Sequence, residues 1–585
     1  MFSTVPYITA MMMVLSCTSA FAWKIDEDIA DSVGEVAALP GEPSSLTAAG
    51  MTRSEERILT LEDSSLLDSP KKRLVIVGGL DGTSESARSV IAAIRWFKTV
   101  APPALRRDWV IAALPCAFPS HCSADQASTV VTLPDVVFPP KNGFYNDETA
   151  PEIRYVWRWV AFQAADLVLE VRSGPRTDWE LSKVAIGVRL KGSLPPAGSL
   201  TAALSSSTPS GLAPVAAIRV SITPNEAPGM LENVLNAASA LERSLLHDAL
   251  VERSERSPLE IAELLARRYP ETPRMSYIPS VAWSNTLRLA VRLHDTELIE
   301  RVRRQMSPFL SGEEPTIAEP YRLTSLAGHF AFADFASLDR NVPPNETDSA
   351  MKLAVKAAEF ILPQVDDDIL RFPREWTDDM FMATSLLARV AAITGDERYA
   401  AVIGRLLTSY ADQLQRPDGL FIHALDGPHA WGRGNGFAIL GLMEALTHLP
   451  EAWVERPKVL EIYRRHAEAL ARHQAPDGMW RQVVDEPGSY RELTVTAMTL
   501  VALTRGLSLG WLDNEYVSII DRGWIGLSTH VAQDGTLVDV CTGTGAGDPR
   551  RYYLDRAAIF GADDRGGAMA LWAAMEIAEF RGQRQ

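Results

Sequence analysis

Cysteine and positive charge are both scarce in this sequence. The 585 residues include 4 cysteines, too few for a fold held together by disulfides, and their spacing fits no zinc-binding motif. Lys and Arg number 57 against 74 Asp and Glu, so the formal net charge is −17 at pH 7. Proteins that bind nucleic acids use surplus positive charge to displace counterions from phosphates, and we therefore expect no nucleic-acid partner.

Long apolar runs are also rare. Beyond residue 22 no stretch reaches the ~20 apolar residues that span a membrane, so we predict no membrane-spanning helix. Residues 7–22 are apolar, end in the small-x-small pattern Ala-Phe-Ala and precede a polar stretch. This pattern predicts a signal peptide over 1–22 and an exported protein, periplasmic or secreted. A lipoprotein site at Cys17 is the alternative interpretation.

The other three cysteines fall into two groups. Cys116 and Cys122 lie in one Pro-rich loop, residues 115–123, and we expect them to form a disulfide in an oxidising compartment. Cys541 stands alone in the sequence and is expected to be a small packed residue.

The chain is too long for a single hydrophobic core, so we expect at least two domains. Residues 23–70 are rich in Ser, Glu, Asp, Pro and Gly and are interpreted as a leader or linker. From 71 to 235, apolar runs at 72–79, 109–114 and 165–171 alternate with helical spacing at 86–98 and 155–163. This alternation predicts an α/β domain with a largely parallel sheet, followed by a connector over 236–256.

Residues 257–582 contain helical patterns and almost no strand signals. Twelve amphipathic stretches are expected at 257–268, 278–293, 296–308, 325–337, 349–363, 377–393, 396–411, 432–447, 453–473, 492–509, 513–529 and 563–580. Twelve helices suit a closed ring of six helical hairpins. An open solenoid would use the same helices but should show a repeating motif, and none is visible. We expect a cleft among the aromatic and charged loops at one end of the ring.

Two neighbouring carboxylates, Asp378 and Asp379, stand at the start of one predicted helix. Acidic residues in a first helical turn often satisfy free N–H groups and complement the helix dipole. Capping alone does not account for Trp376 beside them or for the Met-Phe-Met that follows. Capping and catalysis both remain open for this pair.

A glycine-rich segment opens another predicted helix. It places Gly432, Gly434 and Gly436 among Trp431, Arg433 and Phe437. Three glycines at a helix start are costly unless the backbone must approach a ligand closely. Aromatic side chains around a guanidinium suit a sugar that carries a carboxylate, whereas the alternative is a structural loop with a stacked Arg–Trp pair. No strand precedes the segment, which disfavours a dinucleotide site.

Together these segments resemble a known family. The blocks are Trp-Thr-Asp-Asp-Met-Phe-Met at 376–382, the later His423, Trp-Gly-Arg-Gly-Asn-Gly at 431–436, residues 482–494, and Gly543-Thr544-Gly545 with Tyr552-Tyr553 and Asp564. In this order they resemble the unsaturated rhamnogalacturonyl hydrolases of glycoside hydrolase family 105, which are related to family 88. The resemblance implies an all-α (α/α)6 barrel.

The resemblance also implies an activity and a set of roles. Such enzymes remove a 4,5-unsaturated uronic acid from acidic oligosaccharides left by polysaccharide lyases: an Asp protonates C4 of the vinyl ether, water adds at C5 and the hemiketal collapses. The alignment puts the acid on Asp379, with Asp378 its neighbour and His423 orienting substrate or water. The predicted substrate-binding residues are Trp376, Trp431, Arg433, Asn435, Phe437 and His329. No metal and no cofactor are implied.

The sequence departs from the family pattern in two places. Family members usually carry another Asp on an early helix, but residues 324–329 contain none, and Asp334 is a helical turn or more away. Phe437 stands where Trp is common. The alternative function is therefore a catalytically impaired carbohydrate-binding or scaffold protein on the same folds.

The α/β domain resembles zinc carboxypeptidases and succinylglutamate desuccinylases over about 160 residues. Residues 77–84 look like their His-Gly-x-Glu strand-loop, and 170–174 like their later Asp-Leu-His-Ser-Gly. Asp81, Ser84 and Arg172 replace the family's His, Glu and second His. Since a guanidinium is no zinc ligand, the resemblance implies a metal-free domain that binds sugar, stiffens the assembly or is a structural attachment. Retained peptidase or deacylase activity is a third possibility for the chain.

Overall fold

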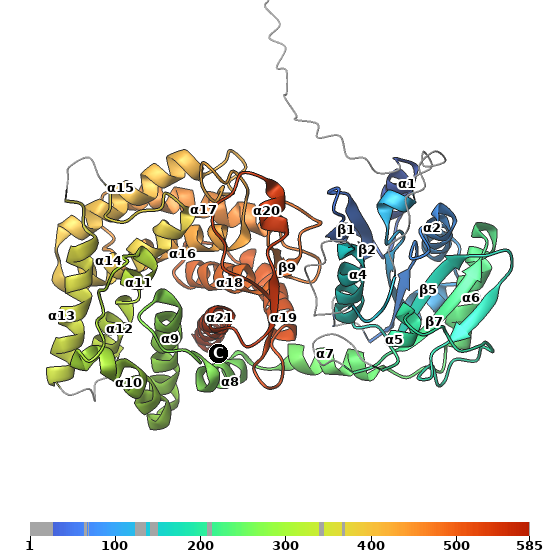
Figure 1. The fold of residues 1–585 in the computed structure, drawn as a ribbon, viewed down its shortest axis with the longest axis horizontal. Helices are drawn as coiled ribbons and strands as arrows, with labels where there is room; N and C mark the ends of the chain where they lie inside the picture. Colours follow the sequence, from blue (N-terminus) through green and yellow to red (C-terminus); the bar gives the residue numbers. More distant parts are fainter. Residues whose placement is uncertain are drawn as a thin grey trace, which may run out of the picture.

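The computed structural model describes residues 27–63, 67, 70–122, 136–140, 150–206, 213–338, 344–364 and 369–583. The predicted signal peptide, with Cys17, lies outside the described residues. Figure 1 shows two bodies side by side, an α/β domain and a ring of helices, bridged by α7 (Leu245–Glu255). In the described part of the chain, no helix combines the length and the apolar character needed to cross a membrane.

The α/β domain is built on a mixed sheet with the order β1-β2-β4-β3-β5-β7-β6 in the described residues. Its central strands β4, β3, β5 and β7 are parallel, whereas β1, β2 and β6 pair antiparallel at the edges. The bounds are β1 Ser45–Met51, β2 Arg57–Glu62, β3 Lys72–Val77, β4 Trp109–Leu114, β5 Leu167–Ser173, β6 Asp178–Leu181 and β7 Ala216–Ile222. The predicted strands and the α/β class are thus confirmed.

Helices cover both faces of this sheet. The elements α1 (Glu27–Ala38), α2 (Ser84–Thr99) and α6 (Ala227–Ala237) pack on one face, where α3 (Pro103–Asp108) also contributes Leu105. The other face carries α4 (Pro151–Phe162) and α5 (Leu200–Ala203). Both faces of the central strands are buried, which is why these strands read as continuous apolar runs in the sequence.

The interpretation of residues 23–70 as a leader or linker was wrong for the part that the structure describes. Helix α1 and the hairpin β1–β2 belong to the folded domain, and β2 joins the hairpin to β4. Strand β1, Ser-Leu-Thr-Ala-Ala-Gly-Met, consists mostly of small residues and has little strand propensity. Its burial comes from the sheet edge and the barrel beside it, which a local pattern cannot reveal.

The predicted disulfide is confirmed, since Cys116 and Cys122 are bonded in the loop after β4. Cys541 is free and buried, as expected for a packed residue.

The C-terminal domain is a closed double ring of helices in the described residues. The inner helices are α9 (Tyr277–Leu293), α12 (Phe330–Leu338), α14 (Thr377–Thr394), α16 (Gly432–His448), α18 (Leu493–Ser508) and α21 (Asp564–Gln583). The outer helices are α8 (Pro258–Arg268), α10 (Thr296–Ser311), α13 (Pro344–Ile361), α15 (Glu397–Leu414), α17 (Arg456–Arg472) and α19 (Tyr516–Thr529). Each inner helix packs on the next, and α21 packs on α9 to close the ring.

This arrangement confirms the twelve predicted helical stretches and the closed ring over the open solenoid. The fourth stretch is divided by Gly328 into α11 (Leu323–Ala327) and α12. Inner helices such as α16 and α18 are buried nearly all round, whereas the outer α15 buries one stripe. Short elements complete the loops: β8 (Trp480–Arg481) pairs with β9 (Arg491–Glu492), β10 (Leu537–Cys541) pairs with β11 (Ala558–Gly561), and α20 is Arg550–Leu554.

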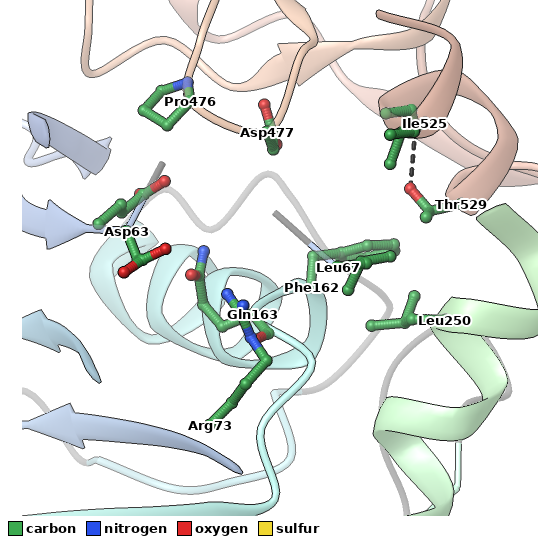
Figure 2. A pocket seen from close by; sticks show the side chains of 12 residues that line it. Asp63, Leu67, Arg73, Phe162, Gln163, Leu250, Pro476, Asp477, Ile525 and Thr529 are labelled. Atoms are coloured by element: carbon green, nitrogen blue, oxygen red, sulfur yellow. Dashed lines mark hydrogen bonds between the residues drawn. The ribbon is translucent and has the colours of Figure 1, made fainter. Parts of the chain in front are cut away.

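Among the cavities that the described residues line away from the mouth of the ring, one on the ring axis and one between the domains bear on the site. One sits on the ring axis, has a volume of about 200 Å³ and is lined by side chains of all six inner helices, among them Arg288, Arg389 and Arg505. The other lies between the two domains (Figure 2). There Phe162, the last residue of α4, and the following Gln163 approach Ile525 and Thr529 of α19. The volume of about 40 Å³ leaves room for water and not for a sugar.

Candidate active site

The inner helices α9, α14, α16, α18 and α21 begin at the same end of the ring. Tyr277, the first residue of α9, packs on Phe437 and Phe381, which lie in the second turns of α16 and α14. The N-terminal end of a helix carries partial positive charge and unpaired N–H groups. Several such ends at one mouth favour an anionic ligand.

A chain of three polar side chains lies at this mouth. The Asp378 carboxylate Oδ2 lies 3.1 Å from His423 Nε2, and His423 Nδ1 lies 2.9 Å from the Tyr553 hydroxyl. His423 is fully buried, whereas the Asp378 side chain is 17% exposed. Asp378 is therefore the member of the chain that a ligand can reach.

The contacts of Tyr553 set the tautomer of His423. The Tyr553 hydroxyl accepts a hydrogen bond from the Gly547 N–H at 3.3 Å and, in the tautomer that we assign to His423, donates its own hydrogen to His423 Nδ1. Burial raises the pKa of the Tyr553 phenol well above its ordinary value, so the phenol keeps this hydrogen. His423 consequently carries its hydrogen on Nε2 and donates it to Asp378.

Aromatic rings surround the imidazole. The His423 ring centroid lies 4.4 Å from that of Trp431, 5.2 Å from Trp376 and 5.7 Å from Tyr553. Trp376 is partly exposed and stands next to the ligand-accessible Asp378. This position is consistent with the substrate-binding role that was predicted for Trp376, since a partly exposed aromatic ring can stack on a sugar.

Asp379 faces away from the ligand-accessible side. It is 1% exposed, and its Oδ2 accepts hydrogen bonds from the N–H groups of Arg374 at 2.7 Å and Glu375 at 2.8 Å and from the Tyr410 hydroxyl at 2.9 Å. Glu375 has φ +62°, a conformation that costs a non-glycine residue free energy. Asp379 thus holds the strained turn that carries Trp376.

Burial raises the pKa of Asp379 to about 6, and this value would suit a general acid. Access argues against that role, because a general acid must touch the atom that it protonates. The raised pKa does not by itself indicate catalysis, since buried structural carboxyl groups also have raised pKa values. The geometry favours Asp378 over Asp379, and the catalytic role predicted for Asp379 stays a prediction.

Arg433 and Trp431 are committed to the protein. The Arg433 guanidinium donates to the carbonyl oxygens of Cys541 at 2.7 Å and Thr542 at 2.8 Å, and stacks on Trp431 at 4.7 Å. Both side chains are almost fully buried. The predicted grip of Arg433 on a sugar carboxylate does not agree with these contacts. These contacts agree instead with the other alternative from the sequence, a structural loop with a stacked Arg–Trp pair.

Three other predicted substrate-binding residues are buried in structural positions. The Asn435 amide joins the main chain of Phe421 to the carbonyl oxygen of Trp431. Phe437 packs in the core against Tyr277 and Phe381. His329 is fully buried, its Nδ1 donates to the Leu326 carbonyl oxygen at 2.9 Å, and burial lowers its pKa to about 4. Direct substrate contact is therefore not supported for Asn435, Phe437 or His329.

The glycines of α16 serve helix packing and not a ligand. A Cβ at Gly432 would lie 2.5 Å from the Arg481 carbonyl oxygen, and one at Gly436 would lie 2.7 Å from the Met498 sulfur. At Gly434 the Cβ would lie 2.7 Å from the Thr377 hydroxyl. The expectation that the backbone approaches a ligand here was wrong, because neighbouring parts of the protein fill the space.

Sequence reasoning left out two tyrosines at the site. Tyr553 belonged to a recognised block but received no role, and nothing local shows that it reaches His423. Tyr410 lies on the outer helix α15, where it reads as an ordinary apolar position. The missing early carboxylate is not supplied by Asp334, which pairs with Arg389 at 2.8 Å beside the axial cavity.

Among the described residues, no group of three or more His, Cys, Asp or Glu side chains is arranged to hold a metal ion. In the α/β domain, Asp81 accepts hydrogen bonds from the Ser86 hydroxyl and the Ser173 N–H, and Arg172 pairs with Glu170. Asp81 and Arg172, which stand at zinc-ligand positions of the resembled family, are thus held by hydrogen bonds and an ion pair within the α/β domain.

Curated relatives align with part of the C-terminal domain. An unsaturated 3S-rhamnoglycuronyl hydrolase of Alteromonas sp. (strain LOR) is 29% identical over 173 residues, which is 27% of this chain and 42% of the relative. An unsaturated rhamnogalacturonyl hydrolase of Bacillus subtilis (strain 168) is 28% identical over 223 residues, 36% of this chain and 60% of the relative. The chain therefore spans about half the length of the curated relatives it matches.

A solved glycoside hydrolase of family 105 from C. acetobutylicum ATCC 824 is 19% identical and has a TM-score of 0.49, covering 55% of this chain and 99% of that one. The sequence profile of Glycosyl Hydrolase Family 88 matches residues 268–581. This match includes the whole mouth of the ring, with Asp378, His423 and Tyr553, and more than half of the chain. The protein is a member of Glycosyl Hydrolase Family 88.

Proposed function

We propose that this protein is a glycoside hydrolase that removes a 4,5-unsaturated uronic acid from acidic oligosaccharides made by polysaccharide lyases. The observation that carries the proposal is the chain Asp378–His423–Tyr553 at the positive ends of the inner helices. The relatives named above act on unsaturated rhamnoglycuronyl and rhamnogalacturonyl substrates, which supports this substrate class. Arg565, partly exposed at the start of α21, adds positive charge for the sugar carboxylate.

In the proposed reaction the carboxyl group of Asp378 donates its proton to C4 of the C4=C5 double bond. Water adds at C5 and returns a proton to the carboxylate, and the resulting hemiketal opens with release of the remaining oligosaccharide. His423 donates to Oδ2 of Asp378, which leaves Oδ1 to carry the transferred proton. One water molecule is consumed, and Asp378 ends in the state in which it began.

Substitution of each carboxylate tests the assignment. We expect Asp378→Asn to lower kcat by about 10²- to 10⁴-fold, the usual contribution of a general acid, and to leave the fold intact. Asp379→Asn keeps an acceptor for Arg374 and Glu375 and should lower kcat by roughly tenfold or less. The assay follows the near-UV absorbance of the conjugated double bond in lyase-generated pectin and glycosaminoglycan disaccharides.

The exposed Asp412 of α15 supplies the control, because Asp412→Asn makes the same chemical change away from the mouth. A larger loss in Asp379→Asn than in Asp378→Asn would reverse the two roles. If folded wild-type protein turns over none of these substrates, the proposed function is rejected. The catalytically impaired alternative predicts binding without turnover, and no contact at the mouth favours it.

For the α/β domain we propose a metal-free descendant of the carboxypeptidase-like fold. Support comes from the bonded state of Asp81 and Arg172. Stoichiometric zinc in the purified protein, measured by elemental analysis, would contradict this proposal.

We also propose export of the chain. The disulfide between Cys116 and Cys122 supports an oxidising compartment. The mass of the protein purified from its native cell is expected to correspond to a chain that begins at Trp23.

A further inference from the structure

The α/β domain contacts the barrel directly behind the candidate active site. In Figure 1 the edge of the domain formed by β1, β2 and α4 faces α20 and β9 of the barrel. The side chains at this face do not form a scattered set of surface contacts. They connect to the residues that hold Trp431, Arg433 and Tyr553.

The first connection begins at Arg158 on α4. Its Nε donates to the Asp539 carboxylate at 2.7 Å, and its Nη2 donates to the Arg491 carbonyl oxygen at 2.9 Å. Both members of the ion pair are buried, at 7% and 0% side-chain exposure. Asp539 has φ +64° in β10, two residues before Cys541, whose carbonyl oxygen accepts from Arg433.

The second connection begins at Glu62 of β2. Both oxygens of its carboxylate accept hydrogen bonds from Arg491, at 2.9 and 2.8 Å, and the Trp159 indole donates to Oε1. The neighbour of Arg491, Glu492, accepts a hydrogen bond from the Cys541 N–H at 2.8 Å. The α/β domain therefore holds the end of β10 from two sides.

The third connection is apolar. Met51, the last residue of β1, packs in one cluster with Trp431 and Tyr553 of the candidate site, together with Val483 and Leu554. Met51 is 1% exposed. Its side chain therefore contributes to the apolar packing around these two aromatic rings, which both lie against His423.

Further ion pairs bring the hairpin end and the barrel together around this cluster. Arg57 pairs with Glu486 at 2.8 Å, and Arg550 pairs with both Glu55 and Glu486. A Cβ at Gly488 would lie 2.9 Å from the Gly50 carbonyl oxygen, so the two backbones approach closely here.

We infer that the α/β domain is a positioning element for the active site of the barrel, and that Arg158 and Met51 are the residues through which it acts. This inference rests on the proposed function. A buried ion pair is a poor source of net stability, but it fixes geometry strongly, because each charge has one favourable place. Arg158 fixes the left-handed turn at Asp539, and Met51 fixes the rings of Trp431 and Tyr553.

The test uses variants of the full-length chain. Met51→Ala removes part of the packing around the two rings, and Asp539→Asn removes the buried ion pair while keeping a residue that tolerates positive φ. We expect each to lower kcat by about tenfold or more, with KM changed less than about threefold, at temperatures well below unfolding. Met51→Leu keeps the volume and should restore kcat to within about twofold of the wild type.

Val90→Ala is the matched control for loss of stability. Val90 lies on the buried face of α2, in a core cluster of the α/β domain that contains no barrel residue. We expect Val90→Ala to lower the Tm, because it removes two buried methyl groups, and to leave kcat unchanged. Equal loss of kcat in Val90→Ala and Met51→Ala would show that the α/β domain affects activity only through the stability of the protein, and would overturn the inference.

Hydrogen–deuterium exchange separates this inference from the proposed function, since it needs no substrate. In Met51→Ala and Asp539→Asn, exchange should become faster in residues 541–553 and stay unchanged in the outer helices α10 and α13. Unchanged exchange in 541–553 would overturn the inference, even if the wild type cleaves unsaturated uronides. Faster exchange with an inactive wild type would support the inference and reject the function.

Discussion

At the scale of single residues, the site depends on which nitrogen of His423 carries the hydrogen. The Tyr553 hydroxyl donates to Nδ1, so Nε2 donates to Asp378. A backbone amide, Gly547 N–H, holds the hydroxyl in place from the other side. The phenol of Tyr553 is therefore separated from Asp378, the proposed acid, by two hydrogen bonds, and we assign it as a positioning residue.

Tyr553→Phe is therefore expected to lower kcat by about 10- to 100-fold, because His423 loses the group that selects its tautomer. The ring remains, so packing against Trp431 is retained and the Tm should change by only a few degrees. Steady-state kinetics over a pH series provides the measurement. A variant with the wild-type kcat and pH profile would show that the hydroxyl does not act through His423. The adjacent Tyr552→Phe is the control for loss of a nearby phenol.

At the scale of elements, the mouth is assembled by close packing of helix α16 on α14. Gly434 lies in the first turn of α16, where a Cβ would come within 2.7 Å of the Thr377 hydroxyl, 3.0 Å of Trp431 and 3.4 Å of His423. None of these neighbours can withdraw easily, since Trp431 and His423 are buried. A side chain at position 434 would consequently disturb both the packing of α16 on α14 and the positions of Trp431 and His423.

Gly434→Ala should lower kcat by tenfold or more and destabilise the protein by about 1–3 kcal/mol through overpacking. Gly229→Ala in α6 is the matched control, because nothing lies within 4 Å of its added Cβ. That control should stabilise the protein slightly, by about 0.5–1 kcal/mol, through helix propensity. Activity assays and urea denaturation measure both effects, and a harmless Gly434→Ala would contradict the packing argument.

The axis of the ring holds a second element-scale feature, a buried network of charges. Glu576 of α21 accepts hydrogen bonds from Arg288 of α9 at 2.8 Å and from Nε of Arg505 of α18 at 2.8 Å. Despite burial, these two arginines lower the pKa of Glu576 to about 2. Because the folded pKa is below the ordinary 4.5, the stabilisation is present above pH 4.5 and is lost as the pH falls toward 2.

Glu576→Gln should accordingly destabilise the barrel by about 3–5 kcal/mol at pH 7, since two buried arginines lose their common partner. The loss relative to the wild type should shrink as the pH falls from 4.5 toward 2. Glu579→Gln, at the partly exposed second partner of Arg288, is the control and should cost much less. Urea denaturation at several pH values is the measurement, and equal losses in both variants would contradict the argument.

At the scale of the whole molecule, buried histidines make global stability depend on pH. Burial lowers the pKa of His329 from 6.5 to about 4. Between these values the unfolded chain binds a proton that the folded protein does not, so stability falls as the pH drops from 6.5 to 4. Asp379 acts in the opposite direction, because its folded pKa of about 6 lies above the ordinary 3.8.

His329→Asn isolates the histidine contribution, because the Asn amide can still donate to the Leu326 carbonyl oxygen but does not titrate. From pH 6.5 to 4, the stability of the wild type should fall more steeply than that of the variant, by about 1.4 kcal/mol per pH unit. Thermal and urea unfolding at matched pH values measure the difference. Parallel curves would mean that His329 is protonated in the folded protein.

The sequence by itself determined the helices of the barrel, the parallel core of the α/β domain, the disulfide and the family. Each follows from local periodicity or from ordered motifs, and such patterns can be recognised from residues that are close together in the sequence. The same motifs brought Asp378, His423 and Trp376 to one site. They did not distinguish residues that face the mouth of the ring from residues that hold those residues in place.

Only the tertiary structure decided those roles. Asp378 and Asp379 are adjacent in one helical turn, yet successive helix positions point about 100° apart, so one reaches the mouth and the other holds the turn behind it. The sequence suggests that Arg433, Asn435 and Phe437 contact a ligand. In the structure, Arg433 and Asn435 donate to main-chain carbonyl oxygens, and Phe437 packs in the core. The role of β1, with Met51 behind Trp431, depends on contacts between residues hundreds of positions apart. Burial of that kind is a property of the assembled chain, and no local pattern carries it.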